Sequence, residues 1–315
     1  MMSEYSDNLL REALGFYDFI NPKAIFIRHN ENITYSIEDE NEEYLIRIHS
    51  EADGLDFSFF RGDFSREILI ASEIDILNEL LAENTIVLQR PIKNKNGYFL
   101  SHLKNGLTVT VLSWLVGETL YGIEFTNEIA YKIGQMTATL HKTANKLPPL
   151  NRCHYDDEFV DVILAELKYA NELNHISMET YNKIEKISTQ YKKILLEEKS
   201  NFTLIHSDLG VRNLIYNGET ISPIDFSLSG YGMPEMDLGD LVINIGKNEL
   251  LPFLFEGYES VHAHKINYEY LNVCKAFGFI QYIVIHHKKL YKDKKFQNRI
   301  NRWCTTIFDP LISQF

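Results

Sequence analysis

The 315-residue chain has few cysteines and no long apolar run, which argues against a disulfide-rich protein, a cysteine-based zinc protein and a membrane-spanning protein. It contains three cysteines, Cys153, Cys274 and Cys304, which lie far apart and form no C-x-x-C pair. This spacing argues against a disulfide framework or a cysteine-based zinc site and predicts reduced, structural thiols. The sequence also lacks a run of about 18 apolar residues, so we expect no membrane-spanning helix and no membrane partner.

Basic residues are also scarce, because 31 Lys and Arg face 44 Asp and Glu and give a formal net charge of −13. A nucleic-acid-binding protein normally carries a basic surface, so we expect no nucleic-acid partner. An acidic surface attracts cationic substrates, but it is equally typical of any soluble acidic protein. The one basic run, residues 286–295, favours a solvated helix end or loop. The first residues are acidic and polar, unlike a secretion leader, so we expect a cytoplasmic protein.

The periodicity of apolar residues changes along the chain and predicts two parts of different structure. A helix is expected near the N-terminus and another from Ser65 to Ala82, with Ile68, Ile76, Leu77, Leu80 and Leu81 as its apolar face. Strands are expected at residues 24–27, 33–37, 44–48, 85–91, 98–103 and 107–114. Helices dominate after the N-cap candidate Thr126, at residues 126–148, 177–198 and 265–308.

The most informative segment is His206-Ser207-Asp208, followed by Asn213 and then by Ile224-Asp225-Phe226. Asn213 lies five residues after Asp208, and Asp225 lies twelve residues after Asn213. Kinases use the same spacing, H-R-D-L-x-x-x-N and then D-F-G. Phosphoryl transfer requires one carboxylate to orient the attacking hydroxyl and oxygen ligands to hold Mg²⁺. We therefore predict Asp208 as the catalytic base and Asn213 and Asp225 as catalytic residues that bind the metal.

The residues around this motif predict how its parts come together. Residues 202–205 favour a short strand before the loop, and residues 214–216 and 221–224 favour two strands joined by Asn217-Gly218. Asn-Gly is a strong hairpin turn signal. Such a hairpin would return Asn213 and Asp225 to one edge, facing Asp208. His206 is expected to be structural and to bond the backbone either of the loop or of the Asp225 segment, because a histidine beside an apolar strand is more often structural than catalytic.

The segment from His206 to Leu241 resembles the aminoglycoside phosphotransferase and choline kinase family, small-molecule kinases with a protein-kinase-like fold. That family usually has H-G-D-x-x-x-x-N, I-D-[FW] and D-L-[AG], and the last appears here as Asp237-Leu238-Gly239. Ser207 replaces the usual glycine. The helix 134–141, Gly-Gln-Met-Thr-Ala-Thr-Leu-His, is similar to a second family motif. The resemblance assigns Asp237 as a structural acid that steadies the catalytic loop, whereas Asp240 is expected to be a helix cap or a surface charge.

The resemblance also implies a nucleotide site in the strand-rich part. Arg47, on a predicted strand, would bind phosphate and pair with Glu73 on the helix, with Glu67 as the rival partner. The turn at residues 29–35 contains no glycine but fits the N-x-x-[TY] pattern of the family, which assigns Asn32 and Thr34 to the nucleotide. Residues 111–115 resemble the segment that connects the two lobes in this family, which we call the connector. Its backbone at Ser113 and Leu115 would bind the purine. Gly117 is expected to act as a hinge.

Together these observations predict an α+β, bilobal protein-kinase-like fold. Residues 1–115 would form a nucleotide-binding lobe with an antiparallel sheet and one helix, and residues 116–315 a larger, mainly helical catalytic and acceptor-binding lobe. The expected activity is transfer of the γ-phosphoryl group of ATP or GTP, with Mg²⁺, to a hydroxyl of a small molecule such as an aminoglycoside or another amino or sugar alcohol. The acceptor is not defined by the sequence. Residues 155–158 either line a cation pocket or form the acidic first turn of a helix.

Two other functions remain compatible with the same motif. The chain is alternatively a protein Ser/Thr kinase, although no long activation segment separates Asp225 from Asp237. It is alternatively a pseudokinase that binds nucleotide without turnover, although Asp208, Asn213 and Asp225 are all retained. Arg212, inside the catalytic loop, either contacts phosphate or substrate or points to solvent.

Overall fold

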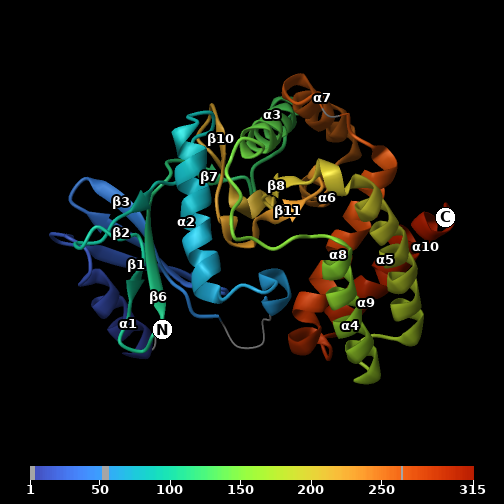
Figure 1. Ribbon diagram of the computed structural model, residues 1–315, viewed down its shortest axis with the longest axis horizontal. Coiled ribbons are helices and arrows are strands. Elements are labelled where there is room, and N and C mark those ends of the chain that lie inside the picture. The colour runs from blue at the N-terminus through green and yellow to red at the C-terminus, as the bar shows by residue number, and fades with distance from the viewer. Residues whose placement is uncertain (1–3, 52–56, 264) are drawn as a thin grey trace.

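The computed structural model describes residues 4–51, 57–263 and 265–315 and has the predicted α+β architecture. An antiparallel sheet formed by the first third of the chain stands on one side of the molecule, and most of the helices stand on the other (Figure 1). Helix α2 (Arg66–Ala82) lies between these two parts. The predicted fold class is therefore confirmed, whereas the division at residue 115 stays a prediction.

The N-terminal sheet consists of antiparallel strands in the order β1-β2-β3-β6-β4, with β5 also paired to β6. The strands are β1 (Lys23–His29), β2 (Ile33–Asp39), β3 (Glu42–Ile48), β4 (Pro91–Ile92), β5 (Ser101–His102) and β6 (Thr108–Ser113). Apolar residues alternate on β2 and β3, so Tyr35, Ile37, Ile46 and Ile48 are fully buried on one face. Helix α1 (Glu4–Leu14) contributes Leu9 and Leu10 to the same core.

Helix α2 begins where the sequence predicts, because the Oγ of its N-cap Ser65 accepts a hydrogen bond from the amide of Ile68 at 3.3 Å. The expected apolar face needs one correction, since Ile68 is 42% exposed while Ile70 and Ile74 are buried. The predicted strand at 85–91 was also wrong. That segment is a loop whose end forms the two-residue strand β4, so its apolar residues pack without a regular ladder.

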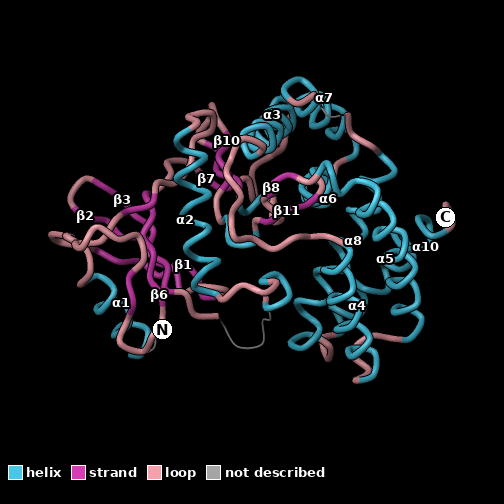
Figure 2. Tube along the Cα trace, viewed as in Figure 1, coloured by secondary structure: helices cyan, strands magenta, loops and turns pink. Residues whose placement is uncertain are grey.

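The rest of the chain is mainly helical (Figure 2). Thr126 and Ser177 cap the helices that were predicted after them. The tail is not one continuous helix, because residues 291–293 separate α8 from α9, and His287 in the basic run is buried rather than solvated. The helices are α3 (Asn127–Ala144), α4 (Asp157–Glu172), α5 (Met178–Glu198), α6 (Pro234–Ile245), α7 (Leu251–Val261), α8 (Tyr268–Leu290), α9 (Lys294–Trp303) and α10 (Asp309–Ile312).

Short strands between the helices carry the predicted catalytic loop. The hairpin of β9 (Leu214–Tyr216) and β10 (Ile221–Pro223) forms as expected, and β7 (Glu118–Thr119) pairs with β9. A second pair joins β8 (Thr203–Ile205) to β11 (Gly230–Gly232). The hairpin turn is closed by the Oδ1 of Asn217, which accepts from the amides of Glu219 and Thr220 at 2.9 and 2.8 Å.

Gly117 is required by the local packing, whereas its expected role as a hinge stays a prediction. A Cβ atom on this residue would lie 2.6 Å from the carbonyl oxygen of Tyr216, and the residue has a φ of +138°. Only glycine fits such a close approach with a positive φ. Elsewhere, the described part of the chain holds no helix with the length and apolar character that crossing a membrane requires. The three cysteines are free and buried.

Candidate active site

Asp208, Asn213 and Asp225 line one polar cavity of about 240 Å³. Strand β8 leads into the loop that holds Asp208, and Asn213 ends the short turn just before β9. The amide of Ile224 donates to the carbonyl of Asn213 at 2.9 Å, which fixes the end of the hairpin beside Asp225. The hairpin thus brings together three side chains that the sequence spreads over residues 208–225.

Asp208 and Asn213 are directly bonded. The Nδ2 of Asn213 donates to the Oδ2 of Asp208 at 2.7 Å and to its backbone carbonyl at 3.0 Å. Burial, followed by the charge of Asp225, raises the pKa of Asp208 to about 7, although the bond from Asn213 opposes the rise. This environment tunes a carboxyl group toward proton exchange near neutral pH.

Asp225 has an unusual backbone and a strongly cationic environment. Its φ of 67° and ψ of 69° lie in the left-handed region, which Asp adopts more readily than most residues. Its Oδ2 is 2.7 Å from the Nη2 of Arg28, and its Oδ1 is 3.5 Å from the Nη1 of Arg47. Burial alone would raise the pKa of Asp225, but Arg47 and Arg28 outweigh burial and lower it. Asp225 is therefore held as a carboxylate.

The predicted pair of Arg47 and Glu73 is present. The Nη1 of Arg47 donates to the Oε1 of Glu73 at 2.9 Å, and both side chains are almost completely buried. Thr34 is the direct cross-strand partner of Arg47, so both project from the same face of the sheet. The rival Glu67 lies elsewhere, with its Oε1 3.5 Å from the Nε2 of His102 on the exposed side.

The carboxylate of Asp237 binds two backbone amides of the catalytic loop. Its Oδ2 accepts from the amide of His206 at 2.8 Å, and its Oδ1 accepts from the amide of Ser207 at 2.7 Å. The Nε2 of His141, on α3, is 2.9 Å from the same Oδ2. The Nε2 of His206 in turn contacts the carbonyl of Ile224 at 3.0 Å. Asp237 and His206 therefore connect the loop, α3 and the Asp225 segment.

Serine at position 207, where the family usually has glycine, adopts a backbone conformation that is unfavourable for a residue with a side chain. Ser207 adopts a φ of +63°, a conformation that costs a residue with a Cβ about 1–2 kcal/mol. The two hydrogen bonds that Asp237 accepts from the amides of His206 and Ser207 stabilise this turn nonetheless.

A second cavity, of about 210 Å³, adjoins the first and is largely apolar. Ile27, Leu45, Ile215 and Ile224 lie on its walls, and Trp114 and Leu115 lie at its connector edge. A largely apolar cavity with connector residues along one edge suits a purine base.

The connector residues differ in how free their backbone is. The amide of Ser113 donates to the carbonyl of Arg90 at 2.8 Å, and its carbonyl accepts from the Nε2 of Gln89 at 3.1 Å. The amide of Trp114 donates to Glu43 at 3.0 Å. Ser113 is therefore engaged within the sheet and is not among the residues that line the cavity, whereas Leu115 is.

Three residues that surround the motif were missed from the sequence. Arg28 contacts Asp225 across 197 residues of sequence. Arg152 is 2% exposed and donates to the carbonyls of Leu69, Phe226 and Ser227 at 2.9, 2.9 and 2.6 Å. It fixes the segment after Asp225 against α2, and no sequence signal marked it because its partners are all backbone oxygens.

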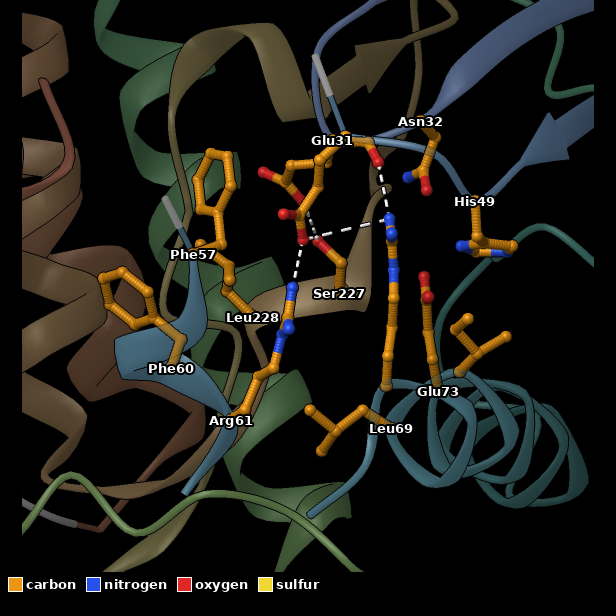
Figure 3. Close-up of a pocket in the computed structure, with 13 residues that line it drawn as sticks. Glu31, Asn32, His49, Phe57, Phe60, Arg61, Leu69, Glu73, Ser227 and Leu228 are labelled. Atoms are coloured by element: carbon orange, nitrogen blue, oxygen red, sulfur yellow. Dashed lines mark hydrogen bonds and ion pairs between the residues drawn. The ribbon is translucent and has the colours of Figure 1, made fainter. Parts of the chain in front are cut away.

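Glu31 is the third missed residue. It lies at the tip of the β1–β2 turn, and its Oε2 accepts from the hydroxyl of Ser227 at 3.0 Å. Burial, then Asp225 and then Asp208, raise the pKa of Glu31 to about 8. Figure 3 shows Glu31 and Ser227 beside a small cavity that also contacts Glu73, between the sheet and α2. Glu31 lines this cavity as well as the cavity of Asp208, so it separates the two.

The residues present fit a divalent cation and phosphate. The Oδ1 of Asp225 and the Nε and Nη2 of Arg47 are buried and have no hydrogen-bond partner within the described residues. An orphaned carboxylate oxygen suits a cation, and orphaned guanidinium nitrogens suit phosphate. No group of three or more His, Cys, Asp or Glu side chains in residues 4–51, 57–263 and 265–315 suits a metal. A cation here would thus rely on one carboxylate, one amide and ligand oxygens, which is typical of Mg²⁺.

The structure decides between the alternatives for residues 155–158 and corrects the expected position of Asp240. Asp156 is the N-cap of α4, and its Oδ1 accepts from the amide of Phe159 at 3.3 Å, so residues 155–158 form a helix start. Asp240 is neither a cap nor a free surface charge. It lies inside α6, with its Oδ1 against Gly278 of α8, and burial followed by Asp208 and Asp237 raises its pKa well above the usual range.

The comparisons with known proteins agree with this geometry. The sequence profile of the phosphotransferase enzyme family, APH, matches residues 24–269. This match covers most of the chain, so the chain belongs to the phosphotransferase enzyme family. It is thus a phosphotransferase, and the resemblance stated from the sequence is confirmed. A search of curated proteins finds no match.

Solved structures share the fold. The amicoumacin kinase hAmiN, in complex with AMP-PNP, Ca²⁺ and Ami, has a TM-score of 0.71 at 16% identity, over 96% of this chain and 93% of that chain. A microcompartment-associated aminopropanol kinase has a TM-score of 0.71 at 18% identity, over 94% of each chain. A choline kinase from Cryptosporidium parvum Iowa II has a TM-score of 0.64 at 15% identity, over 98% of each chain. These likenesses confirm the protein-kinase-like fold.

Proposed function

We propose that the chain transfers the γ-phosphoryl group of ATP or GTP to a hydroxyl of a small cationic molecule, an amino alcohol or amino sugar. The observation that carries this proposal is the shared cavity of Asp208, Asn213 and Asp225, which Asn32 and Thr34 also line from the N-terminal sheet. The adjoining apolar slot provides the space for the base of the donor, with Leu115 at the connector edge.

Each residue has a defined part in the proposed reaction. The acceptor oxygen bonds to the γ-phosphorus while the bond to the β,γ-bridging oxygen breaks, and Asp208 takes the hydroxyl proton. Arg47, fixed by Glu73, binds donor phosphate through its free nitrogens. Asn213 and Asp225 would hold Mg²⁺, which when bound offsets charge on the phosphate oxygens. Asp237 and His206 keep the loop in position.

The acidic surroundings of Asp208 support a cationic acceptor. Glu31 lines the same cavity, and Asp240 is close enough for Asp208 to raise its pKa. Within the described residues, the charged groups that shift the pKa of Asp240 are the carboxylates of Asp208 and Asp237, and no basic group opposes them. An ammonium group would relieve this repulsion between carboxylates. The names of two solved relatives, an aminopropanol kinase and a choline kinase, also point to amino alcohols.

The proposal is tested by incubating the protein with ATP or GTP, Mg²⁺ and a panel of amino alcohols, aminoglycosides and neutral sugars. Phosphorylated product is identified by mass spectrometry. We expect product from one or more cationic acceptors, and Asp208→Asn should lower its rate about 10²–10⁴-fold, the usual contribution of a general base. Undiminished turnover by Asp208→Asn would contradict the role of Asp208. Turnover of neutral sugars alone would contradict the cationic acceptor.

A further inference from the structure

The two cavities of the active site share part of their lining, and we call this shared region the boundary between them. The residues that line both of them are Arg28, Thr34, Arg212 and Asp225. A nucleotide with its base in the apolar cavity and its γ-phosphate beside Asp208 must pass its α- and β-phosphates through this boundary. Arginine forms strong, bidentate hydrogen bonds with phosphate oxygens.

The two arginines reach the boundary from different parts of the fold. Arg28 extends from β1 of the N-terminal sheet, and Arg212 extends from the catalytic loop, directly before Asn213. The guanidinium carbon of Arg212 lies 3.3 Å from the ring centroid of Tyr121. Stacking on a tyrosine holds a guanidinium in place while leaving its N–H groups free to donate. Within the described residues, Arg212 forms no ion pair with a carboxylate.

Arg28 differs from Arg212 because it already has a partner. Its Nη2 lies 2.7 Å from the Oδ2 of Asp225, and its side chain is 44% exposed. Asp225 is the carboxylate that we propose as a ligand of Mg²⁺. A cation held at the Oδ1 of Asp225 would share the charge of this carboxylate with Arg28, which contacts the Oδ2. The ion pair would then weaken and leave Arg28 available for phosphate.

We propose that Arg28 and Arg212 form an arginine clamp, which grips the α- and β-phosphates of the donor nucleotide from the two sides of the cleft. The clamp provides phosphate contacts in addition to those proposed for Arg47. It rests on the proposed function. One arginine belongs to the N-terminal sheet and the other to the catalytic loop, so the bound donor would contact both parts of the fold. The clamp recognises phosphate charge and geometry and makes no contact with the base.

The test compares the binding of ATP and of adenosine, each with Mg²⁺, by isothermal titration calorimetry. The variants are Arg28→Ala, Arg212→Ala and Arg212→Lys. The matched control is Arg299→Ala, because Arg299 also lies over a tyrosine ring, that of Tyr282 at 5.4 Å, but lines neither cavity. Adenosine lacks phosphates, so its binding reports the apolar cavity and the folding of each variant.

Each alanine variant should bind ATP about tenfold or more weakly, as expected for the loss of a charge-assisted bond, and should bind adenosine within about twofold of the wild type. Arg212→Lys should lose part of the ATP affinity because lysine does not stack as a planar fork. Arg299→Ala should match the wild type. Unchanged ATP affinity in Arg28→Ala and Arg212→Ala would overturn the clamp, and so would equal losses for ATP and adenosine. A wild type that binds adenosine as tightly as Mg²⁺–ATP would overturn the proposed function and the clamp together.

Discussion

Replacing Asp237 by asparagine should destabilise the protein and disorder its catalytic loop. Asp237 is completely buried, and its two oxygens accept from His206, Ser207 and His141 at 2.8, 2.7 and 2.9 Å. Asparagine has the same shape, but its NH₂ group cannot accept a hydrogen bond and its charge is zero. Whichever way the amide turns, at least one buried backbone N–H loses its acceptor.

The magnitude follows from these contacts. A hydrogen bond to a charged group contributes about 1.5–3 kcal/mol, and a buried donor without a partner costs a further 1–3 kcal/mol or so. We therefore expect Asp237→Asn to lower the free energy of unfolding by about 3–5 kcal/mol, as is usual when a buried ionic contact is broken. Because Asp208 follows two residues after His206, turnover should also fall.

The assay is urea denaturation followed by circular dichroism, with Asp240→Asn as the matched control. Asp240 lies on the same helix, but burial, followed by Asp208 and Asp237, raises its pKa well above the usual range, so the folded protein disfavours its charged form. Asparagine resembles a neutral acid, and the control should change the unfolding free energy by less than about 1 kcal/mol. Equal losses of stability in the two variants would refute the anchoring role of Asp237.

Two further predictions concern packing and pH. Gly134→Ala should lower the unfolding free energy by about 3 kcal/mol through overpacking, because a Cβ would lie 2.0 Å from the carbonyl oxygen of Leu254 on α7; unchanged urea denaturation would contradict this contact. Stability should fall as the pH drops below about 6.5, since burial, then Arg47 and Arg66, keep the pKa of His49 well below its usual value. The unfolded chain then binds a proton that the folded chain does not. His49→Gln should weaken this dependence in urea titrations between about pH 7.5 and pH 5.5, and an unaltered slope would argue against His49.

Local patterns in the sequence predicted much of the fold. The helix start at Thr126 was predicted because a side-chain oxygen before an apolar repeat marks an N-cap. The helix from Ser177 was predicted from its apolar repeat, and the structure shows that Ser177 is its N-cap. The hairpin at Asn217-Gly218 followed from turn chemistry. The strand predicted at residues 85–91 was wrong because an apolar run packs equally well as a loop against α2 and the sheet. Ile68 was wrongly predicted to be on the buried face of its helix, because it lies in the first, exposed turn.

The site was predictable where neighbouring residues or a known motif carry the chemistry. Asp208, Asn213 and Asp225 fall in one short segment, and a family pattern linked Arg47 to Glu73. Arg28 and Arg152 could not be found in this way. Their partners are 197 and about 75 residues away, and those of Arg152 are backbone carbonyls, which any residue supplies. Only the packing of the chain reveals such contacts.

The most direct test of the proposed phosphoryl-transfer centre is a calorimetric titration of ATP into Asp225→Asn, with and without Mg²⁺. The substitution keeps the size of Asp225 but removes the charge that Arg28 and Arg47 hold ionised. In the wild type, Mg²⁺ should strengthen ATP binding, and in Asp225→Asn this gain should disappear together with turnover. A variant that keeps the full magnesium-dependent gain would contradict the assignment of Asp225 and the centre built around it.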